Sequence, residues 1–285
     1  MAHTFYSDSH QRRLWRVFPD VFQYRGLLFD LVWKDLRVRY RNAMMGLLWA
    51  VLQPLLLTLV LTFVFTYIIP LRISETGDGR VLDRAPFFLC GLIPWQFFSA
   101  SLGVATTSLL ANRDLVKKVY FPRELIPIAA ELNCLVNFVI GFALLLIVRV
   151  ALGGALGAAL LWTPFIFLIQ FVLQVGLGLL LSCAEVHFRD THYIVEIALV
   201  FAFYMTPVIY HLDAVSSRLG STSFLFRLYL ANPVAGLVAA YREAIFYNQS
   251  PDLGLLLWPA LTAAVLLVFG GAVFRRHAPV LADYI

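Results

Sequence analysis

Long apolar stretches separated by short polar segments dominate the chain from residue 46 onward. A helix rises about 1.5 Å per residue, so about 20 apolar residues cross the roughly 30 Å hydrocarbon core of a bilayer. Inside that core the backbone must hydrogen-bond within the span, and uninterrupted apolarity indicates helices rather than alternating barrel strands. The pattern predicts an all-α integral membrane protein with six transmembrane helices, at residues 46–69, 87–110, 125–152, 161–183, 193–210 and 255–274.

The polar N-terminal segment contains a different pattern. Between about residues 24 and 42, apolar side chains recur at helical spacing on one face, and charged side chains occupy the opposite face. We expect an amphipathic helix that lies in the cytoplasmic interface of the membrane. A secretory signal peptide is not expected, because residues 1–45 hold eight Lys or Arg and no uninterrupted apolar core. The predicted apolar face consists of Leu28, Phe29, Val32, Trp33, Leu36 and Tyr40.

The segment between the last two predicted spans, residues 211–254, contains two apolar pieces that are too short to cross a membrane. They cover residues 224–230 and 233–246, and the helix breaker Ala231-Asn232-Pro233 lies between them. Two short helices that enter the membrane and return would fit this pattern. A pair of amphipathic helices on the outer surface would fit it equally well.

Basic residues predict the orientation of the spans. The N-terminal segment holds eight Lys or Arg, the loop 111–124 four, the loop 184–192 one and the tail after the last span two. The opposite side holds seven, including Arg149 near a span end. Fifteen against seven predicts that both termini are cytoplasmic. The expected organisation is a cytoplasmic segment at 1–45, a transmembrane domain at 46–276 and a cytoplasmic tail at 277–285.

Composition agrees with a multispanning membrane protein, because 61% of the residues are hydrophobic, 14% are charged and the mean hydropathy is +0.80. The net charge of +5 does not indicate a nucleic-acid partner, since the basic residues gather on one side of the spans. The three cysteines, Cys90, Cys134 and Cys183, each lie alone in an apolar segment without metal-ligand spacing. We expect them to be packing residues, and we expect no metal site.

The loop 111–124, ANRDLVKKVYFPRE, is the longest polar interruption on the predicted cytoplasmic side. Residues 113–119 can form about two turns of helix, which end ahead of Pro122 because proline disfavours a helical residue before it. This short charged helix would lie against the membrane between two spans. Its candidate contact residues are Arg113, Lys117, Lys118, Tyr120, Phe121, Arg123 and Glu124.

This loop, with Gly46-Leu47-Leu48-Trp49 upstream and His187-Phe188-Arg189-Asp190 downstream, resembles the permease subunit of type-2 ABC exporters of O-antigen, teichoic acid or capsule polysaccharides. The resemblance extends from about Val38 to Arg276. It implies a homodimer paired with two copies of a P-loop ATPase, in which the 111–124 loop would be the coupling helix. ATP and Mg²⁺ would be bound by that ATPase, and the chain has no G-x-x-x-x-G-K-[ST] motif of its own.

Three further expectations follow for particular segments. In the second cytoplasmic loop, Arg189 and Asp190 would form an ion-pair turn, which the resemblance places near the ATPase. The outer hairpin would be re-entrant, as in related exporters. Aromatic pairs recur at helical spacing within spans, either for packing and lipid contact or as a wall on which sugar rings stack. By resemblance, the first and fifth spans line the path, so the candidate path residues are Phe63, Tyr67, Phe201 and Tyr204.

The function expected is export of a lipid-linked polysaccharide across the bacterial cytoplasmic membrane, without enzymatic activity in this chain. An ion-coupled carrier is disfavoured, because Glu131, Glu196 and Arg149 lie near predicted span ends, where Arg149 could snorkel. A type-2 ABC exporter of a small drug or lipid remains an alternative. A membrane-embedded glycosyltransferase or polymerase is another, but Glu75, Asp78 and Asp83 are too scattered for paired carboxylates.

Overall fold

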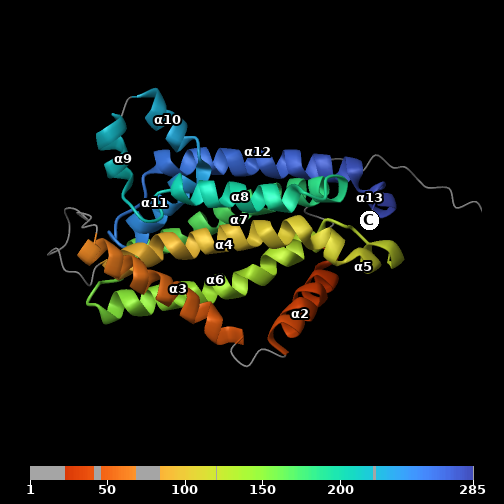
Figure 1. The fold of residues 1–285 in the computed structure, drawn as a ribbon, viewed down its shortest axis with the longest axis horizontal. Helices are drawn as coiled ribbons and strands as arrows, with labels where there is room; N and C mark the ends of the chain where they lie inside the picture. Colours follow the sequence, from red (N-terminus) through yellow and green to blue (C-terminus); the bar gives the residue numbers. More distant parts are fainter. Residues whose placement is uncertain (1–22, 42–45, 69–83, 120, 221–222, 285) are drawn as a thin grey trace, which may run out of the picture.

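The computed structural model describes residues 23–41, 46–68, 84–119, 121–220 and 223–284, and within these ranges the chain forms helices and no strands (Figure 1). The predicted all-α fold class is confirmed. Within these ranges, five helical segments are long and apolar enough to cross a membrane. They are α3 (Gly46–Phe63) continued by the π-helix η2 (Val64–Ile68), α4 (Arg84–Ala111), α6 (Leu125–Ala151), α7 (Thr163–His187) preceded by η4 (Ala158–Trp162), and α12 (Leu253–His277).

Helix α4 lies at the centre of the bundle, where it packs against α6, α7, α3 and α11. In its most apolar stretch 72% of the residues are buried, whereas the corresponding value for α3 is 11%. Figure 1 shows α3 at the edge of the bundle. An apolar helix with so little cover must face lipid or another subunit.

Helices α7 and α12 pack along each other over most of their length. A Cβ atom on Gly176 would lie 2.6 Å from the backbone of Leu266 and Leu267, and one on Gly270 would meet the carbonyl oxygen of Gly176. Small residues allow such close backbone approach between helices in a membrane, where packing rather than hydrophobic burial drives association. These two glycines therefore set the separation of α7 and α12.

Helix α8 (Thr191–Tyr204) corresponds to the predicted fifth span but has only 14 residues. The expectation of a helix to residue 210 is wrong, because the chain leaves helical conformation after Tyr204 and continues irregularly to the start of α9 (Leu212–Leu219). Pro207 explains the break, since proline lacks a backbone N–H and disfavours a helical residue before it. At 1.5 Å per residue α8 is about 21 Å long, shorter than the roughly 30 Å hydrocarbon core.

The outer hairpin consists of α10 (Phe224–Leu230) and α11 (Pro233–Ile245), which meet at 78°. The bend is at the predicted breaker, where the Asn232 side chain accepts a hydrogen bond from the Val234 N–H and caps α11. Eleven of the 13 residues of α11 are buried, and the helix packs against α12, α4 and α7. A helix enclosed by spans in this way favours the inserted hairpin over a pair of surface helices.

The N-terminal helix α2 (Arg25–Arg41) occupies the segment where an amphipathic helix was predicted. Its apolar side chains divide between two environments. Leu28 and Val32 pack, with the buried Leu31, onto a hydrophobic cluster at one end of the bundle. Phe29 and Trp33 stack with ring centroids 6.2 Å apart and remain exposed, as expected for side chains that enter lipid headgroups. The side chain of Tyr40 lies outside the described residues.

The orientation can be tested with cysteine labels at opposite ends of the molecule. Ser217 on α9 and Arg113 on α5 (Arg113–Lys118) are exposed and lie at the two ends of the bundle in Figure 1. The native cysteines are all buried, in agreement with a packing role. In a cysteine-free background, we expect an impermeant maleimide to label Ser217→Cys in intact cells and Arg113→Cys only after permeabilisation. Labelling of both in intact cells would contradict the predicted topology.

Candidate functional site

The first candidate site is the exposed surface of α5. Val116 is buried and fixes the helix to the bundle, while the side chains of Arg113, Lys117 and Lys118 are exposed. Asp114 lies 3.6 Å from Lys118, but this pair is more than 70% exposed and contributes little to stability. The helix therefore presents a basic surface that is free to contact an acidic partner.

The other residues predicted on this loop point toward the chain's own C-terminal end. Phe121 is buried, the Arg123 guanidinium donates to the carbonyl oxygen of Ala278, and Glu124 accepts from Arg275 at 3.3 Å in a largely buried ion pair. Tyr120 lies outside the described residues. The structure thus separates the loop into an exposed basic helix and a segment held against the end of α12.

Helix α2 and the C-terminal helix α13 (Leu281–Tyr284) complete this arrangement. The Lys34 ammonium donates to the Asn112 side-chain oxygen at 2.9 Å, directly before α5. The Leu281 side chain is fully buried in the cluster that contains Val116 and Phe121. We call this assembly of α2, α5, α13 and the end of α12 the cytoplasmic platform, after the side of the membrane on which the sequence predicts it. Because its parts are in contact, a displacement of α5 must move its neighbours.

The loop between α7 and α8 is stabilised by Glu185. Its buried carboxylate accepts hydrogen bonds at 2.8 Å from the backbone N–H and the imidazole Nδ1 of His192. It therefore satisfies a backbone donor in the first turn of α8. Arg189 and Asp190 are both exposed, and no ion pair joins them in the described part of the chain, so the predicted ion-pair turn is not observed. The neighbouring Phe188 ring is 73% exposed.

The four aromatic path candidates are all exposed, and they lie on helices with few buried residues. Their exposed fractions are 54% for Phe63, 73% for Tyr67, 67% for Phe201 and 63% for Tyr204. Phe63 and Tyr67 lie 5.4 Å apart, centroid to centroid, at the end of the first span. By contrast Trp95 and Phe98, another mid-span aromatic pair, are buried in the core. Within the described part of the chain, the four candidates therefore do not belong to the packed core.

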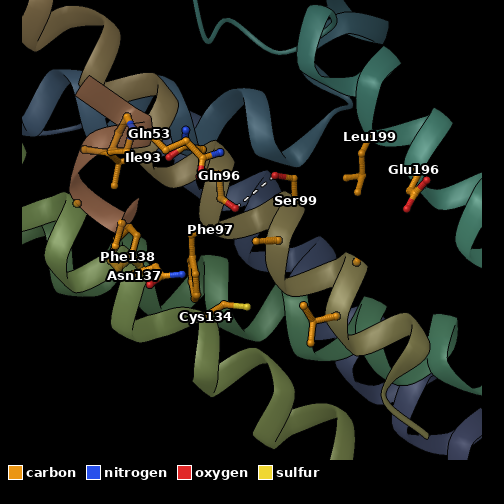
Figure 2. A pocket seen from close by; sticks show the side chains of 16 residues that line it. Gln53, Ile93, Gln96, Phe97, Ser99, Cys134, Asn137, Phe138, Glu196 and Leu199 are labelled. Carbon is orange, nitrogen blue, oxygen red and sulfur yellow. Dashed lines mark hydrogen bonds between the residues drawn. The ribbon is translucent and has the colours of Figure 1, made fainter. Parts of the chain in front are cut away.

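A cavity of about 450 Å³ lies within the predicted membrane region, between α3, α4, α6 and α8 (Figure 2). Its apolar lining includes Ile93, Phe97 and Phe138. Figure 2 shows that the carboxamides of Gln53 on α3 and Gln96 on α4 point toward each other at one side of the cavity. The polar side chains that line it are Gln53, Gln96, Ser99, Asn137 and Glu196.

The composition of this cavity differs from that of its surroundings. Carboxamides both donate and accept hydrogen bonds, and three of them share a cavity with one hydroxyl and one carboxylate. Gln53 follows the start of α3 by seven residues, or about 10 Å, and Glu196 follows the start of α8 by about 8 Å. Amide residues inside otherwise apolar spans were visible in the sequence, but only the packing of four helices brings them to one site.

The end of the bundle that the sequence predicts to face outward is organised around Arg242 of α11, which is buried. Its guanidinium donates to the carbonyl oxygens of Pro207, Val208 and Tyr210, the last at 2.7 Å, and lies 3.9 Å from the centroid of the Phe87 ring. These carbonyls belong to the irregular segment after α8, where backbone groups at membrane depth need partners. Arg242 therefore joins the hairpin of α10 and α11 to the broken end of α8.

Two further contacts reinforce this junction. The Asn232 amide donates to the Thr206 hydroxyl at 2.9 Å, so the hairpin and the break are joined at both ends of α11. Arg149 donates to the Phe246 carbonyl oxygen at 2.9 Å, which means that it caps α11 instead of snorkelling.

Burial, reinforced by the nearby Arg242 charge, lowers the pKa of His211 to about 4, so this imidazole beside the junction is neutral at physiological pH.

Comparison with known proteins gives a consistent result. Residues 27–246 match the family model described as ABC-2 type transporter. The chain is 32% identical over 271 residues to the Myxococcus xanthus protein named O-antigen export system permease protein RfbA, which covers 95% of this chain and 99% of that protein. It is 27% identical over 256 residues to a Klebsiella pneumoniae protein of the same name, covering 88% and 93% of the two chains. An Escherichia coli protein named polysialic acid transport protein KpsM is 25% identical over 250 residues, covering 86% and 90%.

Proposed function

Because the chain belongs to the ABC-2 type transporter family, we propose that it is the permease subunit of an ATP-driven exporter that moves a lipid-linked polysaccharide across the bacterial cytoplasmic membrane. The observation that carries this proposal is the carboxamide-lined cavity between α3, α4, α6 and α8, on a chain whose α3, η2 and α8 also expose aromatic residues. The nearly full-length similarity to permeases named for O-antigen export and polysialic acid transport supports the same class of substrate.

ATP hydrolysis is assigned to a separate P-loop ATPase, which would bind the ATP and Mg²⁺. This chain has no P-loop motif, and α5 offers an exposed basic surface on the cytoplasmic platform. Arg113, Lys117 and Lys118 would contact the ATPase directly, while Phe121, Arg123 and Glu124 would support α5 from inside the platform. The exposed Phe188 and the side chains of Arg189 and Asp190 would form a second contact.

A homodimer with two ATPase copies is the proposed assembly. Helix α3 is only slightly covered, and large apolar side chains of α3 and α8 are exposed, including Leu59, Val60 and Ile197. A second copy facing these helices would enclose a path between the two permeases, with Phe63, Tyr67, Phe201 and Tyr204 on its wall. Both termini would be cytoplasmic, consistent with the basic N-terminal segment and tail.

The alternative functions receive less support. An exporter of a small apolar drug or lipid would share this architecture, but it would have little use for three carboxamides in one membrane cavity. A metal-dependent glycosyltransferase needs clustered carboxylates. Among the residues that the structure describes, no group of three or more His, Cys, Asp or Glu could hold a metal ion, and Glu75, Asp78 and Asp83 lie outside these residues.

Charge reversal on α5 tests the proposal. We expect Arg113→Glu combined with Lys117→Glu to reduce co-purification of the ATPase at least about tenfold and to abolish glycan export by proteoliposomes, because the exposed basic surface would become acidic. Both side chains are exposed, so the permease should still insert and remain monodisperse. The double variant is easier to interpret than Phe121→Ala, because Phe121→Ala would also remove a buried side chain and could lower the stability of the fold.

The matched control is Arg218→Glu on α9, an exposed arginine at the opposite end of the bundle. It should leave ATPase recovery and export unchanged. Normal ATPase recovery and normal export in the α5 double variant would remove this helix from the coupling mechanism. Failure of the wild-type permease and its ATPase to transport any lipid-linked glycan would contradict the proposed function itself.

A further inference from the structure

The two glutamine side chains of the membrane cavity lack partners within the described part of the chain. Neither the Gln53 nor the Gln96 carboxamide hydrogen-bonds to another described residue, although Ser99 donates to the backbone carbonyl oxygen of Gln96 at 3.3 Å. A glutamine on α7 shows the contrasting arrangement, because the Gln170 amide donates to the Pro94 carbonyl oxygen at 2.8 Å. The Gln53 side chain is exposed and the Gln96 side chain is half-buried, so both carboxamides are open to a polar occupant of the cavity.

We propose that this cavity binds an uncharged sugar unit of the transported glycan, an inference that rests on the proposed function and adds a defined subsite to it. Carboxamides match sugar hydroxyls, which also donate and accept hydrogen bonds. Phe97 and Phe138 supply an apolar lining for the C–H faces of a sugar ring. The volume of about 450 Å³ falls within the range of about 300–1,000 Å³ typical of small-ligand sites.

The charge of the lining selects between classes of sugar. Glu196 is the one acidic residue among the described lining residues, and no Lys, Arg or His is among them. A carboxylate or phosphate on the glycan would lose water here without gaining a cation, and it would be repelled by Glu196. The subsite therefore accepts neutral or N-acetylated sugars and rejects acidic ones.

The position of the cavity suits a subsite that the glycan enters early and leaves easily. Glu196 and Gln53 lie about 8–10 Å from the ends of their helices on the predicted cytoplasmic side. Conduction requires sites that bind weakly enough to release each unit. Two glutamines with rotatable side chains provide hydrogen bonds without a fixed charge, which fits weak and repeated binding.

Binding to the intact permease–ATPase complex in nanodiscs tests this inference. The probes are a neutral tetramer of N-acetylglucosamine and a tetramer of sialic acid, with saturation-transfer NMR as the readout. We expect millimolar binding of the neutral probe, at least about tenfold weaker binding of the acidic probe, and an approximately fivefold loss of neutral binding in Gln53→Leu and in Gln96→Leu. The control Thr107→Val, which alters a hydroxyl on α4 outside the cavity, should bind as the wild type does.

A change of selectivity provides a readout that a structural role would not produce. Glu196→Lys should improve binding of the sialic acid probe at least about threefold, because a cation would then face its carboxylate. The inference is overturned by any of three results: no neutral binding to the wild type, unchanged neutral binding in both Leu variants, or equal binding of the two probes to the wild type.

Photocrosslinking during transport separates this inference from the proposed function and does not depend on how the Leu variants fold. Benzoylphenylalanine in place of Ser99 should form adducts with the glycan when ATP hydrolysis is blocked, whereas the probe at the exposed Ile147 on α6 should not. Glycan adducts from Tyr204 without any from Ser99 would reject the subsite and leave the export function intact. Absence of glycan adducts at all positions, together with absence of export, would reject the function.

Discussion

Arg242→Met is expected to leave little correctly assembled permease in the membrane. The variant removes the donors for the carbonyl oxygens of Pro207, Val208 and Tyr210 and the cation beside the Phe87 ring. Each buried carbonyl left unpaired costs about 1–3 kcal/mol. Three such losses approach the whole net stability of about 5–15 kcal/mol of a folded protein.

The measurements for this variant are membrane abundance, monodispersity in detergent and thermal unfolding. Arg242→Lys should recover only part of the stability, since an ammonium group lacks the planar fork that reaches several carbonyls together. The control Arg218→Met removes an exposed arginine from α9 and should unfold at the wild-type temperature. Wild-type stability of Arg242→Met would show that the segment after α8 does not depend on this residue.

Gly176→Ala is expected to produce the second largest loss, through the interface of α7 and α12. Its added methyl group would lie 2.6 Å from the backbone of Leu266 and Leu267, where no flexible side chain can move aside. Overpacking of this kind typically costs about 1–3 kcal/mol. We expect Gly270→Ala to act similarly, because its methyl group would meet the Gly176 carbonyl oxygen.

The control for the glycine variants is Gly103→Ala on α4, where an added methyl group would meet no atom within 4 Å. Alanine is a better helix former than glycine by about 1 kcal/mol, so this change should be neutral or stabilising. The readout is the thermal unfolding temperature of each purified permease. Equal unfolding temperatures for all three variants would mean that α7 and α12 can move apart to admit a methyl group without loss of stability.

Much of the fold follows from patterns within single segments. Apolar length predicts helices that cross a membrane, and the description of α4, α6, α7 and α12 as long apolar helices agrees with this. The breaker at Asn232-Pro233 predicts the bend between α10 and α11. Pro207 also indicates the end of a helix in the sequence, because proline disfavours a helical residue before it. The end of α8 at Tyr204 could have been predicted from it.

The roles of individual polar residues did not follow from these patterns. Arg242 counts as an outer positive charge in the sequence, yet it is buried and bonded to backbone carbonyls. Glu124 belongs to a polar loop, yet it pairs with Arg275, 151 residues away. The roles predicted for the α5 loop and the aromatic path residues in coupling and transport stay predictions, although the structure places all of their side chains except that of Tyr120, which lies outside the described residues.

The sequence by itself determined the class of fold, the helical segments and the similarity to a transporter family, because each depends on the order of residues along one stretch of chain. The tertiary structure decided which polar side chains are buried, which share a cavity and which residues satisfy the broken end of α8. Gln53, Gln96 and Glu196 lie on three different helices, and nothing in the local sequence of one helix specifies the neighbour that it will meet. Long-range packing determines which helices become neighbours and therefore which side chains meet in the cavity.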